Sequence, residues 1–428
     1  MAGPPGPAVA SCAGIGRASG PPPGTLSLSG AAADNGSEMF DLHSALQQLV
    51  RAGGSDLHLK VPSRPLGRVH GELAPLGDFG PLVPEDTVRT LAQMLRDPAK
   101  TAEFEADGEV DFAYAIDGLA RFRVNAFRQR GSISIVARVI PFTVKSVAEL
   151  GLPEVITEIA EEERGLILLT GTTGSGKSTT LAAMLDHINR TRSRHIVTIE
   201  DPIEYLHSDR SSIINQREVG MDTASFSRAM RRVLRQDPDV ILIGEMRDEE
   251  TVRAALSAAE TGHLVMSTVH TLDAPESVNR ILDFFPPHEQ NHARAMLAGT
   301  LRGVVSQRLV RTPDGNGRVC VCEILRLTGR ARDMILDPAQ TGRLQEVIAE
   351  GAYYGMQTFD QALFGHYQAG RISFADALQV ASSPHDFKLL VAAEGRRGTT
   401  MDDLADAREG AAVHAGMVSV AAPSGLGG

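Results

Sequence analysis

Between residues 38 and 145, hydrophobic positions follow first a helical and then a strand-like spacing. The helical pattern ends at Gly53-Gly54, and its single apolar stripe consists of Phe40, Leu42, Ala45, Leu46, Leu49 and Val50. Alternation of apolar and polar residues then predicts half-buried strands at 56–59, 111–114, 121–124 and 133–136. A second helical pattern covers 85–95. We therefore predict a small α+β domain over 38–145, with a linker at 140–143.

The block from 146 to 390 has a different rhythm, because short apolar runs alternate with helical segments. These runs are nearly continuous and lie at 166–169, 196–199, 240–243 and 264–267. Continuous apolar runs are typical of strands covered on both faces, as in the parallel sheets of α/β domains. After about Ser277 the pattern becomes mostly helical. We therefore predict an α/β domain with a helical C-terminal part.

The two ends of the chain have no sustained period of either kind. Residues 1–37 are rich in Gly, Pro, Ala and Ser, and residues 391–428 in Gly, Ala and Asp. Such segments bury too little apolar surface to fold, so we predict disordered terminal arms. The start of the chain lacks an early Lys/Arg cluster, and apolar runs fall short of the ~18 residues that a spanning helix needs. We expect a cytoplasmic protein, at most peripheral to a membrane.

Composition and charge limit the classes of function. Of the 428 residues, 42% are hydrophobic and 22% are charged, as in ordinary globular proteins. The formal net charge is -11. A protein that binds duplex DNA normally has a basic surplus, so we expect no nucleic-acid partner. The three cysteines, Cys12, Cys320 and Cys322, form no C-x-x-C pair, so neither a disulfide framework nor a zinc ribbon is predicted.

The segment 171–178 carries a strong phosphate-binding pattern. It fits G-x-x-x-x-G-K-[ST] and lies between a predicted strand and a predicted helix. Glycines let backbone N–H groups approach phosphate oxygens, and the helix N-terminus adds its positive end. We expect ATP with Mg²⁺, with Lys177 bridging the β- and γ-phosphates and the Ser178 hydroxyl on the metal. The predicted nucleotide-binding residues are Gly171, Thr172, Thr173, Gly174, Ser175, Gly176, Lys177, Ser178 and Thr179.

Acidic residues follow the second and third predicted strands of this block. Glu200, Asp201 and Glu204 come after the second strand, at the edge where an open α/β sheet places its ligands. Hydrolysis needs a group that orients and deprotonates water, so we predict that role for Glu204, with Glu200 and Asp201 nearer the metal. After the third strand, Gly244 stands where many P-loop enzymes have a metal-binding Asp. Glu245 is then expected to act on the metal through bound water. Solvated strand ends or helix caps are the alternative for each acid.

Two histidines flank the fourth apolar run. His270 follows it on the same predicted sheet edge, and we expect it to sense the γ-phosphate. A lone His after a strand is more often a satisfied core or surface residue, and His263, one strand-length earlier, is the weaker candidate. The predicted catalytic set is Lys177, Glu204, Glu245 and His270.

These segments resemble the type II/IV secretion ATPase superfamily. After the phosphate loop come the stretches 198–205 (the "Asp box" of that family), 244–248 and 262–270 (its "His box"), in that order. Supporting stretches lie at 55–58, 121–125, 214–218 and 355–359. Within the superfamily, the chain is most similar to the PilT-like twitching-motility group of type IV pilus retraction ATPases, over about 39–390.

The resemblance implies a PAS-like N-terminal domain (38–145), a RecA-like ATPase domain (146–390) and a ring-shaped homohexamer with ATP between subunits. It also implies arginines that reach the phosphates. By motif position, Arg123 and Arg138 match those of the N-terminal domain, and Arg231 and Arg235, four apart on a predicted helix, match those of the core. An arginine fork suits the charge of a γ-phosphate. For several arginines of 228–235, the alternative is a solvated helix face.

The function implied by the resemblance is a motor ATPase that drives type IV pilus retraction. It would act at the inner face of the cytoplasmic membrane, through an inner-membrane pilus platform protein. Extension and secretion members usually carry a four-cysteine zinc segment that this chain lacks. Retraction members typically read Ala-Ile-Arg-Asn-Leu where residues 330–334 read Arg-Ala-Arg-Asp-Met. An accessory retraction ATPase is therefore one alternative, and an extension or secretion ATPase is another.

Two hypotheses from other classes stay open. A RecA-like DNA translocase would use the basic stretch 228–235, but the acidic net charge opposes it. A regulatory nucleotide-binding scaffold without motor output is opposed by the complete set of carboxylates.

Overall fold

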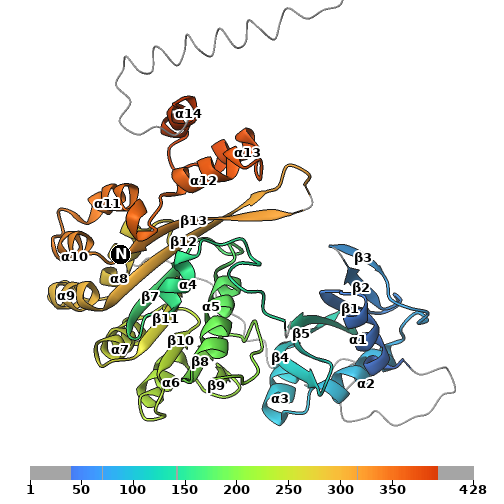
Figure 1. Ribbon diagram of the computed structural model, residues 1–428. Helices are drawn as coiled ribbons and strands as arrows, with labels where there is room; N and C mark the ends of the chain where they lie inside the picture. The colour runs from blue at the N-terminus through green and yellow to red at the C-terminus, as the bar shows by residue number, and fades with distance from the viewer. Residues whose placement is uncertain (1–39, 70, 141–142, 316, 394–428) are drawn as a thin grey trace, which may run out of the picture. The chain divides into compact units, whose positions relative to one another are not determined.

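The computed structural model describes residues 40–69, 71–140, 143–315 and 317–393. Within these ranges the chain divides into two units, one ending at Pro141 and the other beginning at Phe142 (Figure 1). The predicted arm 1–37 and the predicted tail from 394 onward lie outside the described residues, whereas residues 391 and 392 still belong to the last helix. In the described ranges, every helix is too short or too polar to cross a bilayer.

An antiparallel sheet forms the body of the N-terminal unit. In its described part, the spatial order of the strands is β3-β2-β1-β6-β5-β4. The strands are β1 (Asp56–Lys60), β2 (Leu66–Val69), β3 (Glu72–Pro75), β4 (Glu109–Ile116), β5 (Ala120–Gln129) and β6 (Ser132–Ile140). The helices are α1 (Leu42–Arg51), α2 (Pro84–Met94) and α3 (Pro98–Asp107). The two helices and four strands predicted for this unit are therefore confirmed.

Three elements of this unit were not predicted. Every position of β3 is exposed, so this strand has no alternation of buried and exposed residues. Helix α3 buries only Phe104, which is too little for an apolar stripe. Strand β2 contains the buried Gly67 between partly exposed neighbours, so its inner face has no apolar side chain at that position. These elements are stabilised by their contacts with the rest of the unit, and their own sequences carry no repeating apolar pattern.

A mixed sheet forms the centre of the second unit. In its described residues, the spatial order of strands is β13-β12-β7-β11-β10-β8-β9. All neighbours are parallel except β12 and β13, which form an antiparallel hairpin. The strands are β7 (Gly165–Thr170), β8 (His195–Glu200), β9 (Ile213–Glu218), β10 (Val240–Ile243), β11 (Leu264–Val269), β12 (Leu301–Arg311) and β13 (Arg318–Arg326). The four predicted strands are the adjacent strands β7, β11, β10 and β8, as expected for an α/β fold.

Helices cover both faces of this sheet (Figure 1). On β7, Leu166 and Leu168 pack on one side and Ile167 and Leu169 on the other. The first side is covered by α6 (Phe226–Val233), α7 (Glu249–Glu260), α8 (Ala274–Asp283) and α9 (Gln290–Thr300). The second is covered by α4 (Val155–Ala160) and α5 (Lys177–Thr191). Burial on both faces explains why the strands read as continuous apolar runs.

The expectation of a mostly helical pattern after Ser277 is wrong for β12 and β13. Their sequences contain Ser306, Gln307 and Glu323, which are buried through hydrogen bonds and interrupt the apolar runs. Strand β12 also has a bulge, because Leu301 and Gly303 pair with the consecutive residues Leu166 and Ile167 of β7 and leave Arg302 as the extra residue. From residue 329 on the chain is helical as predicted, with α10 (Gly329–Leu336), α11 (Leu344–Glu350), α12 (Phe359–Gln368), α13 (Phe374–Val380), α14 (Pro384–Ala392) and short 3-10 turns at Thr341–Arg343 and Ala352–Tyr354.

Candidate functional site

The loop between β7 and α5 has a backbone geometry that favours glycine. Residues 171–176 form turns, and α5 begins at Lys177. Gly171 has a φ of 136°, and a Cβ added there would lie 2.5 Å from the carbonyl oxygen of Gln307. Gly174 and Gly176 also have positive φ angles, 79° and 96°, a region that other residues rarely adopt. Side chains at these three positions would strain the loop, so the pattern of glycines has a structural reason.

Two polar groups of the loop are suited to an anionic ligand. The buried ammonium group of Lys177 donates to the carbonyl oxygens of Gly171 at 2.7 Å and Thr172 at 3.0 Å. Burial lowers the pKa of Lys177, while the charges of Glu245 and Glu204 raise it. In the described structure, the buried hydroxyl of Ser175 has no hydrogen-bond partner. A phosphate can accept from this hydroxyl and pair with the ammonium group, so these residues fit a nucleotide's phosphates.

The first turn of α5 is fastened to two neighbouring segments. The hydroxyls of Thr179 and Tyr205 are 2.8 Å apart and hydrogen-bonded. The hydroxyl of Thr180 accepts from Nε2 of Gln307 at 2.7 Å. The phosphate loop is therefore held between the segment after β8 and the strand β12.

Glu245 connects the ends of two adjacent parallel strands. It follows β10, and His270 follows β11. One oxygen, Oε1, lies 3.3 Å from Nε2 of His270, and the other, Oε2, lies 2.8 Å from the guanidinium of Arg247. The charge of Glu245 also acts on Lys177. The structure therefore brings the predicted residues Lys177, Glu245 and His270 together at one edge of the sheet.

Arg247 belongs to this cluster, although no role was predicted for it. Its hydrogen bond to Glu245 and, less strongly, the charge of Asp201 raise the pKa of Arg247. It therefore stands between acids from two strand ends. A signal was present, since Arg247 follows Glu245 by two residues in the stretch 244–248. An arginine just after a strand is usually solvated, however, so the pattern alone did not single it out.

The acids at and after the end of β8 lie in different environments. Glu200 is turned toward protein groups, and its Oε1 accepts from the Thr198 hydroxyl at 2.6 Å and from Gln216 at 3.1 Å. Burial raises the pKa of Glu200, and these bonds together with the backbone N–H of Glu204 lower it. Glu204 itself is exposed and close enough to Lys177 to raise its pKa. The charge of Glu204 therefore acts on the phosphate loop, whereas Glu200 fastens the turn that leads to Glu204.

The glycine at position 244 has a steric explanation. Its N–H donates to the carbonyl oxygen of Ile199 at 2.8 Å, and its carbonyl accepts from the Thr268 hydroxyl at 2.7 Å. A Cβ added at this position would lie 3.3 Å from the Cα of Glu200. An aspartate would be crowded here, which explains why the carboxylate comes one residue later, at Glu245.

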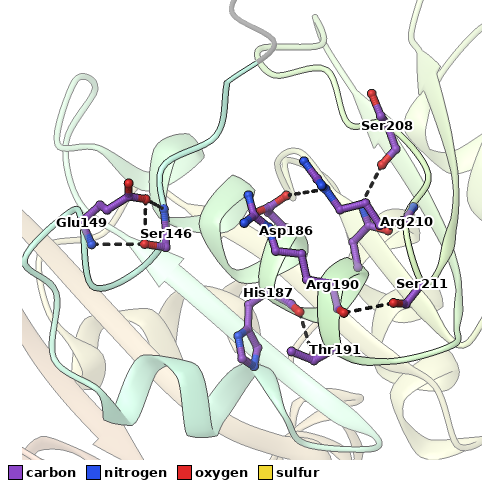
Figure 2. Close-up of polar contacts among 10 residues, drawn as sticks. Ser146, Glu149, Asp186, His187, Arg190, Thr191, Ser208, Arg210 and Ser211 are labelled. Atoms are coloured by element: carbon purple, nitrogen blue, oxygen red, sulfur yellow. Dashed lines mark hydrogen bonds and ion pairs between the residues drawn. The ribbon is translucent and has the colours of Figure 1, made fainter.

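The C-terminal half of α5 anchors the segment that follows Glu204 (Figure 2). Asn189 is buried, donates to the carbonyl oxygen of Ser208 at 2.8 Å and accepts from the backbone N–H of Arg210 at 3.1 Å. Figure 2 also shows Asp186 between two arginines, Arg190 at 2.6 Å and Arg210 at 3.8 Å. One helix thus carries the phosphate loop at its start and holds the neighbouring acidic segment near its end.

Comparison with known proteins agrees with this arrangement. Residues 88–353, more than half of the chain, match the family described as Type II/IV secretion system protein. The chain belongs to this family.

This chain has several relatives that are pilus proteins. It is 43% identical over 348 residues to "Type IV pilus retractation ATPase PilT" of Pseudomonas aeruginosa, covering 81% of this chain and 100% of the relative. It is 45% identical to "Twitching motility protein" of Neisseria gonorrhoeae, covering 72% and 82%. A solved structure of the pilus retraction motor PilT with bound ADP is 42% identical, with a TM-score of 0.75 and coverage of 82% and 99%. Because the chain belongs to this ATPase family and has the nucleotide-binding loop, it is an ATP hydrolase.

The other predicted site residues lie in varied surroundings. His263 is at the amino end of β11, the end opposite to His270, and its Nδ1 lies 2.9 Å from the carbonyl of Ala258. Arg231 is exposed and paired with Glu250. The prediction that Arg235 continues the same helix is wrong, since α6 ends at Val233. Asp237, two residues after Arg235, has a φ of 54° and precedes a proline, and both features are incompatible with a continuing helix.

The two candidate arginines of the N-terminal unit share one face of its sheet. Arg123 on β5 and Arg138 on β6 are directly opposite each other, and Asp56 on β1 is opposite Arg138. The Arg138 guanidinium donates to Asp56 at 2.7 Å, which lowers the pKa of Asp56 against the opposing effect of burial. Arg123 is exposed. Arg138 is therefore oriented by a carboxylate, and Arg123 points to solvent beside it.

Proposed function

We propose that this protein is a homohexameric motor that couples ATP hydrolysis to the retraction of type IV pili. The observation that carries the proposal is its similarity to PilT of Pseudomonas aeruginosa, which extends over 100% of that retraction ATPase. "Type II secretion system protein E" of Xanthomonas campestris is equally similar at 43% identity, but only over 37% of this chain and 26% of the relative. Similarity over the full length supports retraction rather than secretion or extension.

ATP is proposed to bind with its phosphates on the loop 171–179. Backbone N–H groups and Lys177 would hold the phosphate oxygens. Ser178 and Glu245 would hold Mg²⁺, with Asp201 and Glu200 close to it; when bound, Mg²⁺ neutralises charge on the β- and γ-phosphates. Within the described residues, no three Asp, Glu, His or Cys side chains converge on one metal position. Mg²⁺ commonly uses one or two carboxylates together with substrate phosphates, so a metal here would depend on the bound nucleotide.

Water activation is proposed for Glu204, with Glu245 and His270 as a coupled pair. Glu204 is exposed and its charge acts on Lys177, which supports a carboxylate that orients a water and takes its proton. A γ-phosphate near Glu245 would act on His270 through the contact between these two side chains. It would thereby act on the loop after β11, which carries His270. His270 is therefore proposed to sense the γ-phosphate.

The ring supplies the remaining positive charge in this proposal. The two units are proposed to be a PAS-like and a RecA-like domain, with ATP at the boundary between subunits. Arg123 and Arg138 would then act on the phosphates, and Arg231 and Arg235 would contribute from the core. The support is the paired position of Arg123 and Arg138 on one sheet face, with Arg138 held by Asp56.

The motor is proposed to act peripherally at the inner face of the cytoplasmic membrane, on an inner-membrane platform protein of the pilus. One alternative has specific support. The chain is 40% identical to "Type IV pilus ATPase PilU" of Pseudomonas aeruginosa, covering 82% of this chain and 91% of that relative. Residues 330–334, which depart from the retraction pattern, form most of α10. An accessory retraction ATPase is therefore the second candidate.

Piliation of a strain that lacks this protein tests the proposal. Excess surface pili together with lost twitching would support a primary retraction motor. Loss of surface pili would contradict it and indicate an extension ATPase. Retraction that persists with reduced force would favour the accessory role. The matched strain carries Lys177→Ala, which should reproduce the deletion if hydrolysis drives retraction.

A further inference from the structure

A buried carboxylate of β13 connects two helices outside the nucleotide cluster. Glu323 is 1% exposed, and it lies on the sheet face covered by α6 to α9. Its Oε1 accepts from the backbone N–H of Ala274 at 2.9 Å, and its Oε2 accepts from Nε2 of Gln345 at 2.9 Å. Ala274 is the first residue of α8, and Gln345 lies on α11. One side chain thus fixes the start of one helix and contacts another.

The first turn of α8 shows why this carboxylate is needed. The N-terminal N–H groups of a helix have no partner within the helix. Here Asp273 accepts from Glu276 with its side chain at 2.8 Å and from Ser277 with its carbonyl at 3.0 Å. Pro275 has no N–H. The N–H of Ala274 is the one that remains, and Glu323 satisfies it from β13. Without Glu323, a buried donor would lose its partner.

The start of α8 also fixes one end of the loop that carries His270. Only residues 270–273 separate the end of β11 from Ala274. At the β11 end, Val269 pairs with Thr170 of β7, Thr170 with Ser306 of β12, and Ser306 with Glu323 of β13. Both ends of the His270 loop are therefore linked to one row of residues that crosses the sheet. Val269 belongs to this row, and Ala274 is hydrogen-bonded to Glu323 of the same row. That row includes Thr170, which directly precedes the phosphate loop.

We propose that Glu323 is a positioning residue for ATP hydrolysis: by holding the N–H of Ala274, it keeps the loop that carries His270 in reach of Glu245. The inference rests on the proposed role of His270. Through Gln345, Glu323 also ties this loop to α11 in the helical C-terminal part. A displaced loop would change the 3.3 Å approach of His270 to Glu245, and a shift of about 1 Å can cost a catalytic site roughly 100-fold in rate.

The protonation state of Glu323 supports this role. Burial raises the pKa of Glu323 to about 7, while the hydrogen bonds from Gln345 and Ala274 oppose that rise. Among charged groups facing it, Asp273 beside α8 raises the pKa and Arg308 of β12 lowers it. The protonated carboxyl keeps one good acceptor, whereas the structure uses two, for Ala274 and for Gln345. The loop is therefore held best at a pH above about 7.

A double-mutant cycle between Glu323 and His270 tests the inference. In the full-length protein, Glu323→Ala is expected to lower kcat for ATP by roughly 10- to 100-fold, with less than about threefold change in the Kd for ATP, since no phosphate-loop residue is altered. In a His270→Ala background, Glu323→Ala is expected to cause no further loss. An additive loss, or an equal loss of ATP affinity, would overturn the inference. If His270→Ala alone leaves kcat intact, it is the proposed role of His270 that fails.

Two further variants guard against a folding defect. Glu323→Gln keeps the shape and one acceptor, so it should fold, but as a neutral side chain it should keep kcat near the value that the unmodified protein shows below pH 7, without the rise through about 7. An unchanged pH profile in this variant would contradict the inference. The matched control is Glu346→Gln, an exposed residue of α11 paired with Arg343, which should leave both kcat and the pH profile unchanged.

Discussion

Glu200 and Glu204 show how surroundings separate two carboxylates from one strand end. Glu200 accepts hydrogen bonds from Thr198 and Gln216, and burial raises its pKa. Glu204 is exposed, and its charge acts on Lys177. Carboxylates with different surroundings take different chemical roles. Glu200 is therefore suited to holding the turn, and Glu204 to acting on a water at the phosphate loop.

Glu204→Ala is expected to lower kcat by about 10²- to 10⁴-fold, the range for loss of a general base, and to change ATP affinity less than about fivefold, because the phosphate loop is unaltered. Single-turnover hydrolysis and binding of a fluorescent ATP analogue measure the two effects. The control is Glu260→Ala at the exposed end of α7. Loss of ATP binding in the Glu204 variant would instead assign this residue a structural role.

At the scale of elements, α5 organises the site from both of its ends. Its first residue is Lys177, and its buried Asn189 holds the segment 208–210 by two hydrogen bonds. A helix is stiff over this length, so displacement of its end is transmitted to its start. The acidic segment after β8 and the phosphate loop are thus parts of one unit.

Asn189→Ala is expected to destabilise the protein by about 1–3 kcal/mol, because a buried side chain loses two part-buried hydrogen bonds, to the carbonyl of Ser208 and from the N–H of Arg210. Thr191 lies two residues after Asn189 on α5, and its hydroxyl donates an exposed hydrogen bond to the carbonyl oxygen of His187. Thr191→Ala should cost less than ~1 kcal/mol of stability. Urea unfolding followed by circular dichroism compares the two variants. Equal effects would mean that Asn189 does not anchor the segment.

The buried Glu323 predicts a pH dependence of stability. Its pKa is raised from 4.5 to about 7 in the folded protein, so the folded state binds a proton that the unfolded state has released. Its contribution to stability is therefore fully present below pH 4.5 and is lost as the pH rises to 7. The loss amounts to roughly 3 kcal/mol. Urea midpoints at pH 5 and pH 8 should differ less in Glu323→Gln than in the unmodified protein, and an identical difference would contradict the prediction.

At the scale of the whole molecule, sequence patterns predicted elements with a repeating apolar period and failed where polar groups are buried. Strands β7, β8, β10 and β11 were predicted because their apolar runs are continuous. Strands β12 and β13 were missed because hydrogen-bonded Ser306, Gln307 and Glu323 interrupt theirs. A pattern cannot tell a satisfied buried polar group from a solvated one, because the partners come from distant segments.

For the site, too, some features could be predicted from the sequence and others could not. The phosphate loop follows a local motif, so its residues could be named from the sequence. The convergence of Glu245 and His270 followed from parallel strands that end at one edge. The contacts of Arg247 and the inward turn of Glu200 depend on side-chain placement, which periodicity does not contain. The placement of Arg123 and Arg138 relative to a nucleotide stays a prediction.

Mixing two inactive variants tests whether the site is shared between subunits. Arg123→Ala and Lys177→Ala subunits should each be inactive alone. If Arg123 acts on a neighbour's phosphate loop, a 1:1 mixture regains activity, since about one quarter of random interfaces combine an intact loop with an intact arginine. ATPase assays before and after mixing measure this. No recovery in rings shown to exchange subunits would place Arg123 outside the neighbour's site.

The bulge in β12 determines where the chain tolerates a change in length. Deleting Arg302 would remove the extra residue and leave the pairing of Gly303 and all later positions with β7 unchanged. Deleting Val304 instead would shift the flanking residues by one and exchange Ser306 and Gln307 between the faces of the sheet. The first deletion should give a folded ATPase and the second should not, as thermal unfolding and hydrolysis assays would reveal. Homologous chains should therefore vary in length at the bulge and keep a constant length from there to the hairpin turn.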